Sequence, residues 1–206
     1  FTYTLESLIQ AGKSLTAVNL ALTLAAGDGR ILLIDCDMRK PTTHLLVRGK
    51  KGPGLSDVLV GRAKLSEAVQ TSLPNTHLAY LPSGSSVPSP ADLLANRTVA
   101  SLLEGLRKFY DWIIIDTPPV GAVSEALVLA PHADGMVVVA GAEMVPKKAV
   151  LHTLERIHDS GARILGVVLN RAWGDGDHDV EDLEDVDQHG DEDDSEDRRE
   201  EGRSHP

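Results

Sequence analysis

An unbroken apolar run that ends in two aspartates constrains the fold of this sequence more than any other feature. Residues 31–34 read Ile-Leu-Leu-Ile, and Asp35 and Asp37 follow them. A strand lacks polar alternation when both of its faces are covered, as in a parallel sheet between two layers of helices. Ligands of open α/β sheets bind at the carboxyl ends of the strands. The run therefore predicts a buried parallel strand that carries two carboxylates to a ligand site, although a turn with capping carboxylates is the simpler alternative.

Two further motifs lie on either side of this strand in the sequence. Residues 112–119 read Trp-Ile-Ile-Ile-Asp-Thr-Pro-Pro, so Asp116 ends a second apolar strand, and residues 12–14 are Gly-Lys-Ser at the start of an Ala- and Leu-rich segment. Gly-Lys-Ser closes the P-loop pattern, in which backbone amides cradle phosphate, the lysine contacts the outer phosphates and the hydroxyl binds Mg²⁺. By itself the tripeptide equally fits a helix start with a solvated lysine. The order of the three motifs predicts a nucleotide–magnesium site.

Apolar runs and helical patterns alternate along the rest of the chain. This alternation predicts an α/β fold with a mostly parallel sheet, helices on both faces and right-handed crossovers, as in the P-loop NTPases. The predicted strands are residues 1–4, 30–35, 76–81, 111–116, 135–140 and 164–170. The predicted helices are residues 14–26, 65–70, 93–109, 124–130 and 147–160, with a further short helix that follows a turn at residues 52–57 and ends near residue 60.

The acidity of the chain is concentrated at one end. Of the formal net charge of -11, residues 174–206 contribute 16 Asp and Glu against 3 Arg, whereas the remainder is nearly balanced. A segment of this composition buries too little apolar surface to offset its ordering entropy. We therefore expect a folded domain over residues 1–173 and a disordered acidic tail over residues 174–206, serving either interaction or solubility. Nothing in the near-neutral domain predicts a nucleic-acid partner.

The cysteine content and the hydropathy of the sequence bear on the cellular compartment and on membrane spans. Cys36 is the single cysteine, so no intramolecular disulfide or cysteine zinc cage can form, which fits a reducing compartment. No apolar run reaches the roughly 20 residues that a membrane span needs. The sequence begins at Phe1 rather than Met, so we regard it as a candidate fragment.

Together these motifs resemble the cytoplasmic domain of the bacterial tyrosine kinases (BY-kinases), relatives of the MinD/ParA ATPases. The resemblance runs from about residue 12 to residue 171, and its most specific parts are Asp-Cys-Asp-Met-Arg at 35–39 and Asp-Thr-Pro-Pro at 116–119. It implies an ATP-dependent protein-tyrosine autokinase that regulates capsular or exopolysaccharide synthesis and export. It also implies a membrane polysaccharide co-polymerase or adaptor, fused upstream or separate, as partner. The resemblance further implies a homo-oligomer in the cytoplasm, at the inner face of the cell membrane.

The resemblance also implies a role for each motif residue. The ATP phosphates would be bound at the start of the first helix by Gly12, Lys13, Ser14 and Leu15. Mg²⁺ would be held by Ser14, Asp37 and Asp116. Asp35 would orient or deprotonate the incoming tyrosine hydroxyl, and Asn170 would contact the adenine edge. The catalytic set is then Lys13, Asp35, Asp37 and Asp116.

This sequence departs from the family pattern in three ways. Gln10 and Ala11 stand where the family has Gly and Glu, and a positive φ at Gln10 would cost about 1–2 kcal/mol. The first strand lacks the family's long apolar run. The tyrosine-rich tail is missing, because Tyr3, Tyr80 and Tyr110 are the three tyrosines. Two alternatives therefore stay open: a catalytically weak, nucleotide-binding regulator of polysaccharide assembly, and a MinD/ParA-like ATPase.

Overall fold

The computed structural model describes residues 1–7, 12–71, 76–118, 125–142 and 146–172. These residues belong to one compact unit, Phe1–Ala172. The predicted acidic tail, residues 174–206, lies outside the described residues, as do Gln10 and Ala11. None of the helices in the described part is both long and apolar enough to cross a bilayer.

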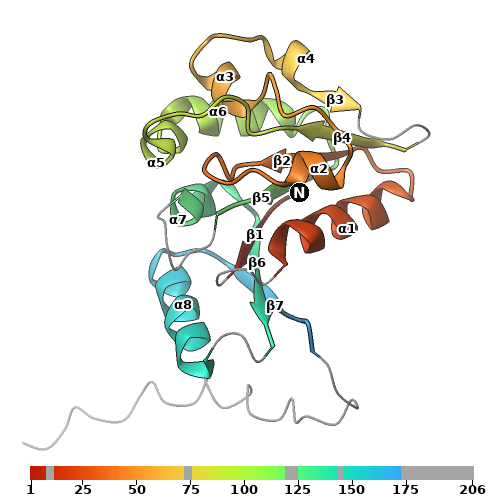
Figure 1. Cartoon of the computed structure of the whole chain (residues 1–206). Helices are drawn as coiled ribbons and strands as arrows, with labels where there is room; N and C mark the ends of the chain where they lie inside the picture. The colour runs from red at the N-terminus through yellow and green to blue at the C-terminus, as the bar shows by residue number, and fades with distance from the viewer. Residues whose placement is uncertain (8–11, 72–75, 119–124, 143–145, 173–206) are drawn as a thin grey trace, which may run out of the picture. The chain divides into compact units, whose positions relative to one another are not determined.

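A seven-stranded sheet forms the middle layer of this unit (Figure 1). The strands are ordered β3-β4-β2-β5-β1-β6-β7, and all neighbours are parallel except β3 and β4. Their bounds are β1 Thr2–Ser7, β2 Ile31–Asp35, β3 Gln70–Thr71, β4 Leu78–Leu81, β5 Trp112–Asp116, β6 Gly135–Gly141 and β7 Ile164–Asn170. The predicted mostly parallel sheet is confirmed.

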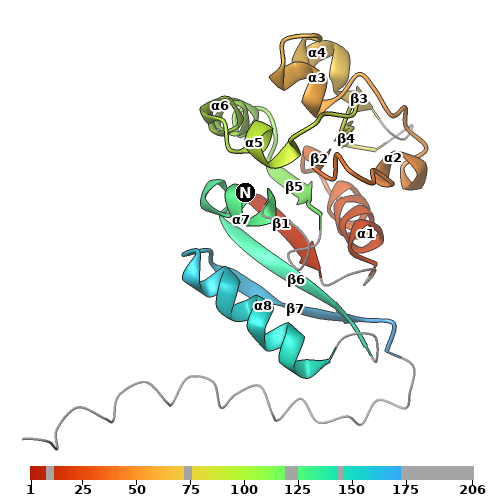
Figure 2. The ribbon, with the colours of Figure 1, turned by 60° about the vertical axis from the view of Figure 1, so that its left-hand side comes forward.

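Helices cover both faces of the sheet, as Figure 2 shows from the side. On one face lie α1 and α2, and on the other lie α5, α6, α7 and α8. The helices are α1 Lys13–Ala25, α2 Thr43–Leu46, α3 Leu55–Leu59, α4 Leu65–Ala68, α5 Pro90–Leu94, α6 Arg97–Leu106, α7 Glu125–Leu129 and α8 Lys147–Asp159, with a 3₁₀ turn at Ala130–His132. This two-sided cover is the reason for the unbroken apolar run in β2. Alternate residues of that strand, Leu32 and Ile34 against Ile31 and Leu33, join two separate core clusters.

The N-terminal strand β1 is more central than its sequence indicates. It pairs with β5 on one side and β6 on the other, so the weak strand signal at residues 1–4 becomes a strand in the interior of the sheet. Thr2 and Thr4 are buried there, and neither hydroxyl has a partner among the described residues. At its start, the Phe1 ring packs on Trp112 with ring centroids 5.0 Å apart. Pairing with two apolar strands, rather than local composition, holds this segment in place.

The predicted single helix over residues 93–109 is wrong. The segment instead forms two helices, because α5 starts earlier, at Pro90, and ends at Leu94, and a new helix starts after Asn96. Asn96 has extended backbone angles, and its side chain accepts the amide of Thr98 at 3.1 Å. This N-cap satisfies an amide that would otherwise lack a partner, which favours a helix start at that point. The short elements α2 and β3 have no counterpart in the sequence prediction.

Candidate nucleotide-binding and phosphotransfer site

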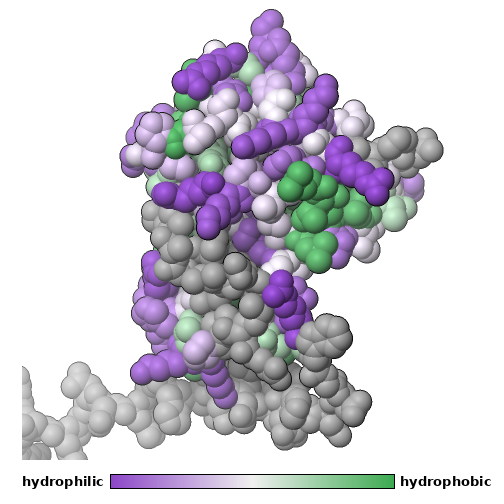
Figure 3. All heavy atoms as spheres, in the orientation of Figure 1, coloured by the Kyte–Doolittle hydropathy of each residue, from purple (hydrophilic) through white to green (hydrophobic). Residues whose placement is uncertain are grey.

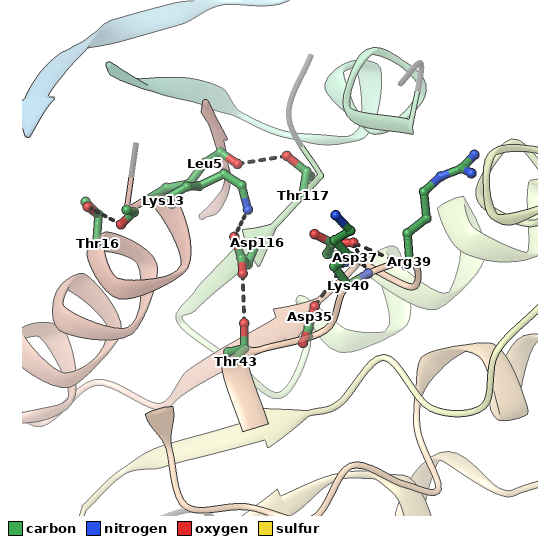
Figure 4. Close-up of polar contacts among 11 residues, drawn as sticks. Leu5, Lys13, Thr16, Asp35, Asp37, Arg39, Lys40, Thr43, Asp116 and Thr117 are labelled. Atoms are coloured by element: carbon green, nitrogen blue, oxygen red, sulfur yellow. Dashed lines mark hydrogen bonds and ion pairs between the residues drawn. The ribbon is translucent and has the colours of Figure 1, made fainter. Parts of the chain in front are cut away.

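The start of α1 and the carboxyl ends of β2 and β5 converge on one cluster of charged side chains (Figure 4). Lys13, in the first turn of α1, is buried, and its Nζ forms an ion pair with Asp116 Oδ1. The other carboxylate oxygen of Asp116 accepts the hydroxyl of Thr43 at 2.8 Å. Asp116 is itself fully buried at the end of β5, so both of its oxygens have a partner.

Asp35 lies beside Asp116, because the two residues are register partners of adjacent parallel strands. It is also fully buried, yet its surroundings differ. Oδ1 accepts the amide of Asp37 at 3.0 Å, whereas Oδ2 forms no hydrogen bond of regular geometry among the described residues. The buried Tyr80 hydroxyl is its polar neighbour, and burial together with the carboxylates of Asp35 and Asp116 raises the pKa of Tyr80. Burial, followed by the charge of Asp116, raises the pKa of Asp35 to about 7, although the Asp37 amide and Lys13 oppose that change. A carboxylate in this condition can exchange a proton near neutral pH.

Asp37 shapes the loop that follows β2. Its Oδ1 accepts the amides of Arg39 at 3.2 Å and Lys40 at 2.9 Å, which closes a tight turn. The side chain of Arg39 extends away from Asp116 in Figure 4. Asp37 is half-buried, so its carboxylate is partly accessible to solvent.

The start of α1 has the geometry of a phosphate cradle. Gly12 caps the helix with a φ of 79°, and a Cβ there would collide with the side-chain amide of Asn170. Asn170, at the end of β7, therefore lies directly against the helix start. Ser14 is half-buried and Leu15 is exposed in the first turn, whose amides have no partner within the helix and form an anion site.

The structure thus brings every predicted site residue to one edge of the sheet. Sequence reasoning missed two threonines that support them. Thr43 bonds Asp116 from α2, a helix with no recognisable motif, and Thr117 donates to the Leu5 carbonyl at 2.8 Å, which fastens the end of β5 to β1. Thr117 was readable as part of Asp-Thr-Pro-Pro, whereas nothing in the sequence relates Thr43 to a residue 73 positions away.

The donor set suits Mg²⁺ and a nucleotide. It offers carboxylate and hydroxyl oxygens, one buried cation and one buried oxygen without a hydrogen bond of regular geometry. Over the described ranges, no group of three or more His, Cys, Asp or Glu side chains could hold a metal by itself. Mg²⁺ takes few protein ligands and retains water and phosphate oxygens.

Fold and site together define a P-loop nucleotide-binding protein. A family model described as an AAA domain matches residues 10–165. The tyrosine-protein kinase YwqD of Bacillus subtilis (strain 168) is 37% identical over 159 residues, which cover 77% of this chain and 67% of that protein. The tyrosine-protein kinase wzc of Salmonella typhimurium is 36% identical over 160 residues, but the chain spans only 22% of its length.

Solved structures agree with this assignment. The chimerical protein CapA2B2 is similar with a TM-score of 0.81 and 34% identity, covering 84% of this chain and 76% of that one. MinD from Pyrococcus horikoshii, solved with Mg-ADP, shares the fold at a TM-score of 0.69 and 22% identity over 82% of this chain and 69% of that one. The chain belongs to the bacterial tyrosine-protein kinase family.

Proposed function

We propose that this domain transfers the γ-phosphoryl group of ATP to tyrosine, as part of the control of capsular or exopolysaccharide synthesis. One observation carries the proposal. Lys13 is buried against Asp116 at a helix start, directly beside Asp35, whose raised pKa suits proton transfer at neutral pH. A tyrosine hydroxyl has a pKa near 10, so a nearby carboxylate assists the loss of its proton.

Each residue at the sheet edge has a part in this reaction. The amides at the start of α1 and the Lys13 ammonium bind the phosphates, and Asn170 contacts the base. Asp35 Oδ2 takes the proton of the tyrosine hydroxyl. The hydroxyl oxygen of the tyrosine bonds to the γ-phosphorus, and the bond between the γ-phosphorus and the leaving ADP breaks. Ser14, Asp37 and Asp116 would hold Mg²⁺, which supplies charge neutralisation to the transferring phosphoryl group. Positioning and electrostatics account for most of the catalysis of this reaction type.

The membership of this family suggests a partner for the domain. The chain spans 22% of the length of the wzc protein. We propose that the kinase domain acts with a membrane polysaccharide co-polymerase or adaptor, fused or separate, at the inner face of the membrane. Assembly into a homo-oligomer is part of the same proposal.

We also propose that residues 174–206 are an appendage that nucleotide binding does not need. A protein ending after residue 173 is expected to keep its ATP affinity and melting temperature, and a clear fall in either would contradict that division.

The decisive experiment incubates the protein with labelled ATP and Mg²⁺, with and without a membrane adaptor from the same genome, and maps any phosphotyrosine. Asp35→Asn should retain ATP binding and lose transfer, whereas Lys13→Met should lose binding. Release of inorganic phosphate without phosphotyrosine would favour the ATPase alternative. Binding without turnover would favour the regulator, whose case rests on Gln10, Ala11 and the missing tyrosine cluster.

A further inference from the structure

A cavity of about 570 Å³ lies outside the cluster around Lys13 and Asp116. It is bounded by the segment before α3 and by the loop that follows β4, and its polar lining includes Lys51, Arg62, Asp57, Ser85 and Ser86. This volume is in the range of sites that bind small ligands or a few side chains. None of these residues has a part in the nucleotide site described above.

One wall of the cavity follows the end of β4, the strand next to the one that carries the candidate base. β4 and β2 are parallel neighbours, with Leu81 the register partner of Ile34, so the chain leaves both strands at the same level. Asp35 follows Ile34 directly, and the cavity loop starts directly after Leu81. The α3 start is fastened to that loop, because the amide of Leu55 donates to the Pro82 carbonyl at 2.7 Å. A chain seated in the cavity can therefore reach Asp35 without crossing the sheet.

The walls of the cavity are held rigidly. Asp57 Oδ2 accepts the amides of Gly54 at 3.0 Å and Ser85 at 3.1 Å, and the Ser56 hydroxyl donates to the Ser85 carbonyl at 2.7 Å. A Cβ at Gly84, where φ is 87°, would collide with the side chains of Asp57 and Ser56. The carboxylate of Asp57 is thus occupied in joining the two walls. Burial would favour its protonated form, but the bonds from Ser85 and Gly54 and the charge of Arg62 outweigh it and lower its pKa.

The charged side chains that line the cavity are two cations, Lys51 and Arg62, and one carboxylate, Asp57. Within the described part of the chain, Lys51 and Arg62 form no ion pair. Hydrophilic side chains lie among neutral and some apolar ones at this end of the molecule, over α3 and α4, in Figure 3. At the base of the loop, the buried hydroxyl of Ser83 also lacks a partner among the described residues.

We propose that this cavity docks acidic residues that flank the acceptor tyrosine of a polypeptide substrate. The inference rests on the proposed kinase function and adds the class of acceptor to it. Carboxylates of the acceptor pair with Lys51 and Arg62, and the planar guanidinium of Arg62 can hold one of them through two parallel hydrogen bonds. The tyrosine then extends along the sheet edge toward Asp35. Acceptors without acidic neighbours bind more weakly, because the two cations stay unpaired.

The test measures binding of fluorescent peptides to the full chain by polarisation, with Mg-ADP present, so that no phosphotransfer is required. One peptide carries Glu and Asp on both sides of a tyrosine, and its match carries Ser and Asn at those positions. The acidic peptide should bind about ten-fold more tightly at low salt, and raising the ionic strength should remove most of the difference. Lys51→Glu with Arg62→Glu should weaken the acidic peptide about ten-fold and leave the neutral peptide within two-fold.

A matched control separates local pairing from bulk charge. Lys108 is exposed after α6 and shortly before the start of β5, so it lies at the opposite edge of the sheet. Lys108→Glu should change binding of either peptide less than two-fold. ADP affinity and melting temperature confirm that each variant is folded.

The outcomes distinguish the docking site from the kinase function. Equal binding of the two peptides, an equal loss in Lys108→Glu, or binding of inorganic phosphate at these cations with no preference for the acidic peptide would overturn the docking site. Selective binding of the acidic peptide through Lys51 and Arg62, in a protein that forms no phosphotyrosine under any condition, would support the docking site and contradict the kinase function.

Discussion

The ends of β2 and β5 carry the same sequence pattern and lie side by side, yet their carboxylates bind different partners. Both strands are apolar runs that end in aspartate, and Asp35 and Asp116 are register partners. Asp116 is neutralised by Lys13 and bonded by Thr43. Asp35 accepts one backbone amide, and its other oxygen has no cation and no hydrogen bond of regular geometry, with the Tyr80 hydroxyl as its polar neighbour. The two carboxylates are equally buried. Their hydrogen-bond and ion-pair partners differ because different neighbouring elements supply them.

This difference assigns separate tasks to two similar groups. Asp116 holds Lys13 and Thr43 in place. Burial, followed by the charge of Asp116, raises the pKa of Asp35 to about 7, so this carboxyl group can exchange a proton near neutral pH. The variants below test whether the asymmetry between Asp35 and Asp116 exists in solution.

The largest effect is expected for Asp116→Ala. It removes the partner of buried Lys13 and the acceptor of Thr43, and an ammonium left unpaired in the interior destabilises by about 3–5 kcal/mol. Urea unfolding followed by circular dichroism measures the loss. The matched control is Asp111→Ala, which breaks an exposed pair with Arg30 of 3.0 Å and should cost far less. Equal losses in the two variants would show that Asp116 is no anchor.

Asp35→Asn should act in the opposite direction, and its effect should depend on pH. Folding raises the pKa of Asp35 from 3.8 to about 7, so between these values the folded chain holds a proton that the unfolded chain has released. The free energy of unfolding of the wild type therefore falls as pH rises through this window and levels off above it. The shift corresponds to about 4 kcal/mol across the window. Asparagine does not titrate, so the free energy of unfolding of the variant should rise relative to that of the wild type from pH 4 to pH 7.

Unfolding of both proteins at several pH values gives this difference directly, because the other titrating groups cancel between them. A stability difference that stays constant with pH would mean that Asp35 ionises like an exposed carboxylate. The contrast with Asp116 would then be lost, and the case for Asp35 as the base would weaken with it.

Asp37→Asn tests the metal side of the comparison. If Asp37 helps to hold Mg²⁺ beside Asp116, the variant should weaken Mg-ATP binding about ten-fold, or about 1.4 kcal/mol, and metal-free ATP binding much less. Isothermal titration with and without Mg²⁺ measures both values. The amide oxygen of Asn can still accept the bonds from Arg39 and Lys40, so the loop is preserved. An equal loss in the two titrations would exclude Asp37 from the metal site.

The smallest effect is expected for Thr43→Val. It deletes one neutral donor to Asp116 and keeps the shape of the side chain, so stability should fall by about 1 kcal/mol. The pH dependence attributed to Asp35 should persist in this variant. Thr23→Val is a suitable control, because the Thr23 hydroxyl bonds the Asn19 carbonyl on the exposed surface of α1. A loss no greater than that of the control would mean that Asp116 depends on Lys13 alone.

The sequence alone determined that the sheet is mostly parallel and covered on both faces, and which residue types lie at its edge. Runs without polar alternation indicated strands covered on both faces, and Gly12-Lys13-Ser14 with Asp35, Asp37 and Asp116 indicated phosphate and metal chemistry. These are local signals, because periodicity and turn chemistry depend on neighbouring residues. The break of the predicted helix at Asn96 was local too and readable as an N-cap, but the apolar spacing on either side obscured it.

Only the tertiary structure decided how these parts meet. The position of β1 inside the sheet, the bond from Thr43 to Asp116 and the contact of Asn170 with Gly12 all join segments that are distant in the chain. The protonation of Asp35 likewise depends on burial by several elements and on the charge of a neighbouring strand. Such properties arise from long-range packing in a low-dielectric interior, where the same residue gains or loses partners according to what is folded against it.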